Sequence, residues 1–288
     1  MNKMFKAALE FVVFSICIIQ LSCTGNLLRD IGDNTTDEAL FYSAKQNLNS
    51  SAWAEAITNF SAMSSDFLAD REVKFWHASA YAGRCGYDFL TMLEDLQGAT
   101  NPKLFAFFMA AYGGATATSI QDCVSAEAIL TSIGDASDRS PKENLFMMFL
   151  SLAKIGVVLS ARADTDDDGL ADGGFDACDT NDLPDSEARH LGTAIANANL
   201  SLAALAASGV SVGTSETAGI GTFCTALGAA VPDPSYDFCN LTDISALSAD
   251  QVWAIRTAIQ EGDTTGIGSC TDFANAFTPQ GGGGCLCP

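Results

Sequence analysis

A short acidic stretch at the centre of the chain holds the residues best suited to chemistry. Residues 164–172 read Asp-Thr-Asp-Asp-Asp-Gly-Leu-Ala-Asp, and carboxylates occupy positions one, three, five and nine, which are Asp164, Asp166, Asp168 and Asp172. Gly169 at position six permits a sharp turn, and the carbonyl of Leu170 at position seven adds an oxygen. Oxygens at this spacing are the ligands that a short loop supplies to Ca²⁺. We therefore predict a structural calcium site.

Two features beyond these nine residues refine the calcium prediction. An EF-hand has a glutamate at position twelve, whereas this chain has Phe175, with Asp176 and Cys178 shortly after it. The whole run 164–185 resembles one thrombospondin type 3 repeat, in which aspartates bind calcium and a following cysteine often forms a disulfide. The resemblance implies Asp176 as a further ligand. The alternative is a solvated acidic turn, but five aspartates in nine residues repel one another, and a bound dication removes that cost.

Two long helices are expected to position the acidic loop. Ser140-Pro141 combines a capping residue with a proline suited to the first helical turn, and a strongly apolar pattern continues to residue 161. A second helix, rich in alanine and leucine, is expected over residues 185–207 and ends at Ser208-Gly209. The loop would then connect two antiparallel neighbours.

The rest of the chain also favours helices. Helical patterns occupy residues 35–48, 52–63, 70–84, 87–96, 102–112, 115–134 and 251–260, and alternating strand-like runs are scarce. We therefore expect an all-α fold of antiparallel helical pairs. Trp53, Ala56, Ile57 and Phe60 lie on one helical face, and small residues recur 34 positions apart at Ala44 and Ala78. In this respect residues 37–97 resemble tetratricopeptide repeats, which implies a groove that binds peptides or partner proteins. A generic helical bundle is the alternative.

The N-terminal residues predict export. Lys3 and Lys6 precede an apolar run over residues 11–21, as in a signal peptide. The run ends in Leu21-Ser22-Cys23, which resembles the lipobox of bacterial lipoproteins, although Gln20 departs from that pattern. The resemblance implies that residues 1–22 are removed, that Cys23 is lipidated, and that residues 23–34 tether the body to the outer membrane. An ordinary cleaved signal with an incidental cysteine is the alternative.

The cysteines of the exported chain predict disulfides. Eight remain after Cys17 and Cys23 are set aside, and they are Cys85, Cys123, Cys178, Cys224, Cys239, Cys270, Cys285 and Cys287. An even number in an oxidising compartment indicates as many as four bonds. Proximity in sequence favours Cys85 with Cys123 and Cys224 with Cys239. Residues 210–288 are expected to form an irregular, disulfide-clamped region packed on a helical domain of residues 35–209. A zinc site at Cys285 and Cys287 is the alternative, but no histidine lies nearby.

The composition limits the classes of function that this chain could have. The 288 residues are 48% hydrophobic and 17% charged, which suffices for a sizeable core, and the net charge of −21 argues against nucleic acid as a partner. No catalytic motif stands out, and His77 and His190 are the only histidines. We therefore expect no enzyme. We expect a lipid-anchored cell-envelope protein that acts as an interaction or assembly scaffold for a protein partner. A periplasmic ligand-binding helper of a transport system, with a cavity lined by aromatic residues, is the alternative.

Overall fold

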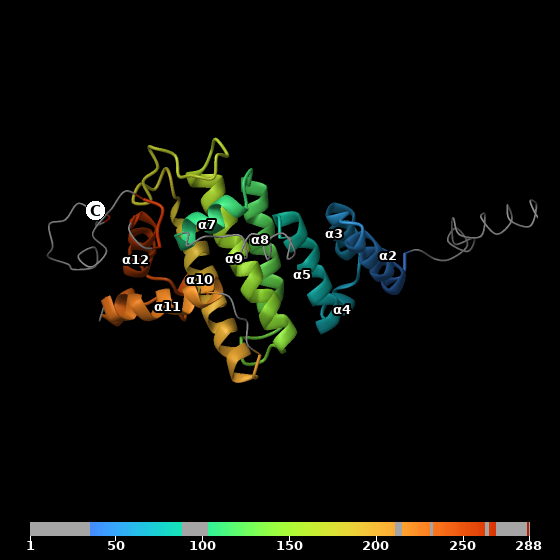
Figure 1. The fold of residues 1–288 in the computed structure, drawn as a ribbon. Helices are drawn as coiled ribbons and strands as arrows, with labels where there is room; N and C mark the ends of the chain where they lie inside the picture. The colour runs from blue at the N-terminus through green and yellow to red at the C-terminus, as the bar shows by residue number, and fades with distance from the viewer. Residues whose placement is uncertain are drawn as a thin grey trace, which may run out of the picture.

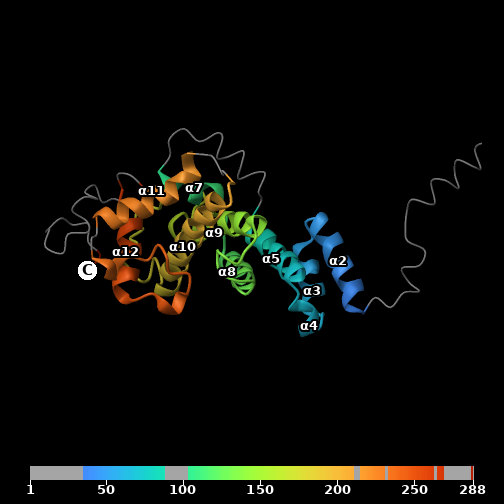
Figure 2. The ribbon, with the colours of Figure 1, turned by 90° about the horizontal axis from the view of Figure 1, so that it is seen from below.

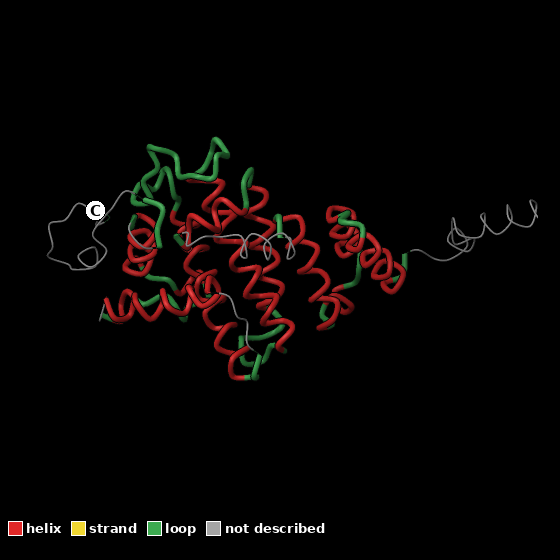
Figure 3. Tube along the Cα trace, viewed as in Figure 1, coloured by secondary structure: helices red, strands yellow, loops and turns green. Residues whose placement is uncertain are grey.

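The chain is all-α, as the sequence predicts. The computed structural model describes residues 35–87, 103–210, 215–230, 233–262, 265–268 and 287. Within these ranges it has ten α-helices, two short 3₁₀-helices and no β-strand (Figures 1 and 3). The expected signal peptide, the lipidated Cys23 and its tether lie outside the described residues, as does nearly all of the helix expected over 87–96.

Most of the helices lie side by side in one row. They are α2 (Asp37–Asn49), α3 (Trp53–Ser61), α4 (Ser65–Leu68), α5 (Arg71–Cys85), α7 (Leu104–Ala111), α8 (Ala117–Thr131), α9 (Pro141–Ala163), α10 (Asp185–Ala207), α11 (Ser215–Ala230) and α12 (Ala249–Gln260), with η1 (Pro234–Tyr236) and η2 (Ile244–Ala246) before α12. Each helix contacts the next one in the order α2, α3, α5, α8, α9, α10 and α12 (Figure 2). The expected long helical pair corresponds to α9 and α10, which run in opposite directions (Figure 1).

Helix α9 forms the centre of the core. Ser140 caps its first turn, and the carboxylate of Glu143 accepts a hydrogen bond from the backbone N–H of Ser140. This helix therefore begins where the sequence predicts. It is long and apolar enough to cross a membrane, but 83% of its most apolar stretch is buried inside the protein, which is the environment of a core helix. Gly156 lets α7 approach closely, because a Cβ there would overlap the carbonyl oxygen of Phe108 and the ring of Tyr112.

A buried polar network joins α8, α9 and α10. Lys154 on α9 is fully buried, and its ammonium pairs with Glu127 on α8 and donates a hydrogen bond to Oγ1 of Thr193 on α10 at 2.9 Å. The second oxygen of Glu127 accepts from Asn197 on α10 at 2.8 Å. Burial lowers the pKa of Lys154, while the carboxylate of Glu127 opposes that shift. One ion pair therefore connects three helices in the middle of the fold.

The region after residue 210 is more regular than expected. It contains α11, a helix of 16 residues, where the sequence pattern of glycine, threonine and serine predicts an irregular chain. Gly219 and Gly221 lower helix propensity, but Ile220, Phe223 and Leu227 are spaced to share one face and are buried against the core. Tertiary packing of this apolar face outweighs the weak local propensity.

Three disulfides connect distant parts of the described chain. Cys85 bonds to Cys123 and joins α5 to α8, while Cys224 bonds to Cys239 beyond the end of α11. Both pairs are those that sequence proximity favours. The third bond joins Cys178 in the acidic loop to Cys287 at the C-terminal end. Cys270 and Cys285 lie outside the described residues. Several disulfides in one chain indicate an exported protein in an oxidising compartment.

The environment of His77 generates a prediction about acid stability. Its ring stacks on Phe60 at 4.8 Å between centroids, lies 5.3 Å from Tyr81, and has a buried Nε2 without a hydrogen-bond partner. Burial lowers the pKa of His77 from 6.5 to about 4. Because the folded pKa lies below the unfolded one, the stabilisation is complete above pH 6.5 and is lost as the pH falls towards 4. His77→Phe should therefore lose less free energy of unfolding between pH 7 and pH 5 than the unchanged chain, as measured by urea unfolding. Identical losses in both proteins would contradict this account, since the carboxylates titrate alike in both.

Candidate metal site and aromatic groove

The acidic loop folds back over the C-terminal end of α9. Asp164 follows the last residue of that helix and is only 3% exposed. Its Oδ1 accepts from the backbone N–H of Asp168 at 2.9 Å, and its Oδ2 accepts from that of Gly169 at 3.1 Å. Gly169 has a φ of +81°, the left-handed conformation that glycine adopts without steric cost. The sharp turn expected at position six is therefore present.

Three of the predicted ligands come together. Asp164, Asp166 and Asp172 each offer a carboxylate oxygen within 4.8 Å of the other two, and this group could hold a metal ion. Oδ2 of Asp172 accepts hydrogen bonds from the backbone N–H and the hydroxyl of Thr165, at 3.2 and 2.5 Å. Three carboxylates this close repel one another, and hard oxygen donors suit a hard cation such as Ca²⁺. The donor set therefore fits the predicted type of ion.

The other predicted ligands do not belong to this aspartate triad. Oδ1 of Asp168 accepts from the backbone N–H of Leu170 at 2.8 Å, and Oδ1 of Asp176 accepts from that of Cys178 at 2.9 Å, so both carboxylates cap local turns. The side chain of Leu170 is 67% exposed. Asp167 is exposed, and its carboxylate lies against Gly113.

The second half of the loop is attached to α12. The Cys178–Cys287 disulfide lies next to Ala177, whose N–H donates to Oε1 of Gln260 at 2.9 Å. Arg256 is buried, and its guanidinium donates to the carbonyl of Ala177 at 2.6 Å and to Asp185 at 2.7 Å. Sequence reasoning missed Arg256, because its partners lie 71 and 79 residues away. This attachment connects the loop to the C-terminal region.

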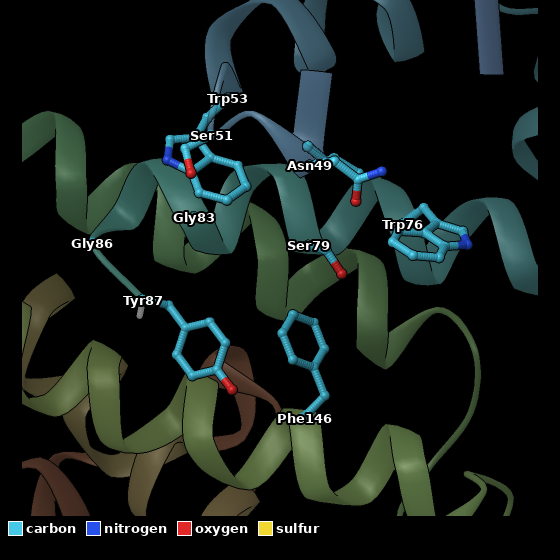
Figure 4. A pocket seen from close by; sticks show the side chains of 10 residues that line it. Asn49, Ser51, Trp53, Trp76, Ser79, Gly83, Gly86, Tyr87 and Phe146 are labelled. Carbon is cyan, nitrogen blue, oxygen red and sulfur yellow. The ribbon is translucent and has the colours of Figure 1, made fainter. Parts of the chain in front are cut away.

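A second feature, the aromatic groove, lies between the N-terminal helices and α9. It has a volume of about 630 Å³ and is lined by Leu48, Asn49, Ser51, Trp53, Trp76, Ser79, Gly83, Gly86, Tyr87 and Phe146 (Figure 4). Trp53 lies directly over Gly83, where a Cβ would overlap the indole ring. Tyr87 and Phe146 form the opposite side, with ring centroids 5.5 Å apart.

The aromatic groove differs from the core in exposure and charge. Trp53 and Trp76 are partly exposed, whereas Phe60 and Phe108 are fully buried. None of the lining residues is charged, but the ammonium groups of Lys45 and Lys142 lie 5.0 and 5.7 Å from the Trp76 ring. Lys45 also pairs with Glu72, whose carboxylate accepts a hydrogen bond from Nε1 of Trp76, so this end of the groove carries charges of both signs.

The comparisons with known proteins assign no relative to this chain. No protein-family model, no curated protein and no solved structure matches it. The resemblances to lipoproteins, tetratricopeptide repeats and thrombospondin type 3 repeats therefore rest only on the sequence motifs that suggested them.

The aspartate triad predicts calcium-dependent stability. Calcium at millimolar concentration should raise the melting temperature, because an ion that binds the folded chain stabilises it by mass action. Asp166→Asn should abolish this rise, since Asp166 is exposed and belongs to the triad. Asp179→Asn is the matched control, because Asp179 lies in the same loop outside the triad and should leave the response intact. Chelation should increase hydrogen exchange in residues 164–185 while distant helices stay protected. Calorimetry without binding heat, or an equal calcium response in Asp166→Asn, would contradict the prediction.

Proposed function

We propose that this chain is a lipid-anchored cell-envelope protein that acts as an interaction or assembly scaffold. The observation that carries the proposal is the aromatic groove, an accessible surface of aromatic, hydroxyl and amide groups between helical layers. The lipobox-like sequence ending at Cys23 and the three disulfides support the cell envelope as its location. The scaffold would reach its partner from the membrane through the tether of residues 23–34.

The chemistry of the aromatic groove suits a protein segment. Tryptophan and tyrosine contribute much of the binding energy at protein interfaces, because each buries a large apolar area and also offers a polar group. Asn49, Ser51 and Ser79 add hydrogen-bonding groups along the same groove. A segment with apolar side chains would complement its neutral floor, and polar groups on that segment would complement the charged groups around Trp76.

Calcium has a structural role in this proposal. Asp164, Asp166 and Asp172 would hold the ion where α9 ends, and Arg162 pairs with Glu187 at 2.5 Å to join α9 to α10 beside the loop. The ion would neutralise the clustered carboxylates and thereby stabilise the turn. The aromatic groove shares no residue with the aspartate triad, so partner binding would not require calcium as a direct ligand.

A second candidate is a periplasmic ligand-binding helper of a transport system. A separate groove of about 830 Å³ favours it, because that groove is lined in part by the buried Arg139. A binding helper needs such a concave site with a few convergent polar groups.

Site-specific photo-crosslinking tests the scaffold proposal. A photoreactive residue at Asn49, which is exposed and lines the aromatic groove, should yield a defined adduct in envelope extracts. The control is Tyr42 on the same helix, which is 65% exposed and lies outside the groove. Trp53→Ala should abolish the adduct from Asn49, because it removes the largest contact surface on that side. Equal adducts from Asn49 and Tyr42, or no adduct with and without calcium, would contradict the proposal.

A further inference from the structure

Arg139 is a buried cation without a carboxylate partner among the described residues. It lies between α8 and α9, is 6% exposed, and its Nη1 has no hydrogen-bond partner. Its Nε donates only to the carbonyl of Asp135, at 3.3 Å. Four other arginines of the described chain pair with carboxylates, namely Arg71, Arg84, Arg162 and Arg256, while Arg189 donates to the carbonyls of Ile244 and Leu247.

The neighbouring acids do not neutralise Arg139 directly. Burial lowers the pKa of its guanidinium, and the carboxylates of Asp135, Glu143 and Glu127 oppose that shift. Glu143 is bound at both oxygens by Arg71, and Glu127 is bound by Lys154. A buried guanidinium without a close partner is costly, so a group that is absent from the chain itself is expected to complete it.

Arg139 lines a groove that offers the remaining features of a binding site. This arginine groove, of about 830 Å³, is lined by Asp135, Ala136, Ser137, Arg139, Pro141, Asn144, Leu200, Ala203, Ala204, Ala207, Ser208, Asn240 and Thr242. One wall is the apolar face of α10 around Leu200 and Ala204. The groove shares no lining residue with the aromatic groove.

Two further polar side chains line the arginine groove beside the cation. Asn144 is 2% exposed, and its Nδ2 donates to the carbonyls of Ala136 and Arg139, which leaves Oδ1 buried as an acceptor without a donor. Asp135 is exposed, forms no ion pair with a described residue, and accepts through Oδ1 from Ser137 and Asp138 of its own turn. The groove thus presents a cation, an anion and an apolar wall, while Oδ1 of Asn144 is closed off from solvent.

We propose that the arginine groove binds a zwitterionic ligand of the apolar α-amino-acid class. The ligand's carboxylate pairs with the guanidinium of Arg139, its ammonium pairs with the exposed carboxylate of Asp135, and its side chain lies along Leu200 and Ala204. The positive end of α9, which begins at the groove-lining Pro141, also favours the ligand's carboxylate. This proposal is independent of the scaffold proposal and gives the second candidate function a ligand class.

Thermal shift and calorimetry on the full mature chain test the ligand with three probes. L-leucine carries all three recognised groups, 4-methylpentanoate lacks the ammonium, and 3-methylbutylamine lacks the carboxylate. We expect leucine to raise the melting temperature in a concentration-dependent way. Each partial ligand should bind at least about tenfold more weakly, because it leaves a buried or charged partner unsatisfied.

Substitutions separate a ligand site from a structural arginine. Arg139→Met should abolish the leucine response while the ligand-free melting temperature stays equal or rises, because an unpaired buried charge is removed. Lys103→Met is the matched control, since it removes an exposed positive charge outside both grooves and should keep the leucine response. If Arg139→Met does not fold, Asp135→Asn provides the test, and it should weaken leucine binding but leave 4-methylpentanoate binding unchanged.

Several results would overturn the proposal. The first is no rise in melting temperature with leucine, and the second is equal affinity for leucine and 4-methylpentanoate. The third is an undiminished leucine response in Arg139→Met or, if that variant does not fold, in Asp135→Asn. Failure here leaves the photo-crosslinking result at Asn49 unaffected, because the two grooves share no lining residue.

Discussion

The buried ion pair between Lys154 and Glu127 constrains the packing of the whole helical row. A charge at the centre of a core is stable only when its partner and its remaining hydrogen bonds are in place. Here Glu127 comes from α8, while Thr193 and Asn197 come from α10. A slip between α8 and α9 would leave a charge unpaired, and a slip of α10 would leave hydrogen bonds of the buried pair unmade. The pair therefore fixes the register of the three central helices.

The three central helices hold the distinctive features of the molecule in place. The C-terminal end of α9 carries the aspartate triad, and its N-terminal end lies beside the arginine groove. On the other side, the Cys85–Cys123 bond joins α5 to α8, and Trp76 of α5 and Phe146 of α9 both line the aromatic groove. The two grooves are assembled from segments far apart in sequence, so both depend on the packing of the centre.

Local signals predicted part of this structure, and long-range contacts decided the rest. The capping box at Ser140, with Pro141, locates the start of α9, because both act within one helical turn. The close cysteine pairs were likewise predictable, whereas Cys178 and Cys287, 109 residues apart, were one choice among many. Periodicity marked residues 141–161 as a core helix but could not identify Glu127 as the partner of Lys154. The spacing of the acidic loop predicted Asp164, Asp166 and Asp172 correctly as a cluster, but not that Asp168 and Asp176 would cap local turns.

A double-mutant cycle at the central ion pair tests this account most directly. Lys154→Met and Glu127→Gln should each lower the free energy of unfolding by about 3–5 kcal/mol, because each leaves one buried group without its partner. The double variant should lose clearly less than the sum of the two single losses, because no unpaired charge remains. Urea unfolding that shows single losses below about 1 kcal/mol, and a double loss equal to their sum, would contradict the claim that this pair fixes the packing of α8, α9 and α10.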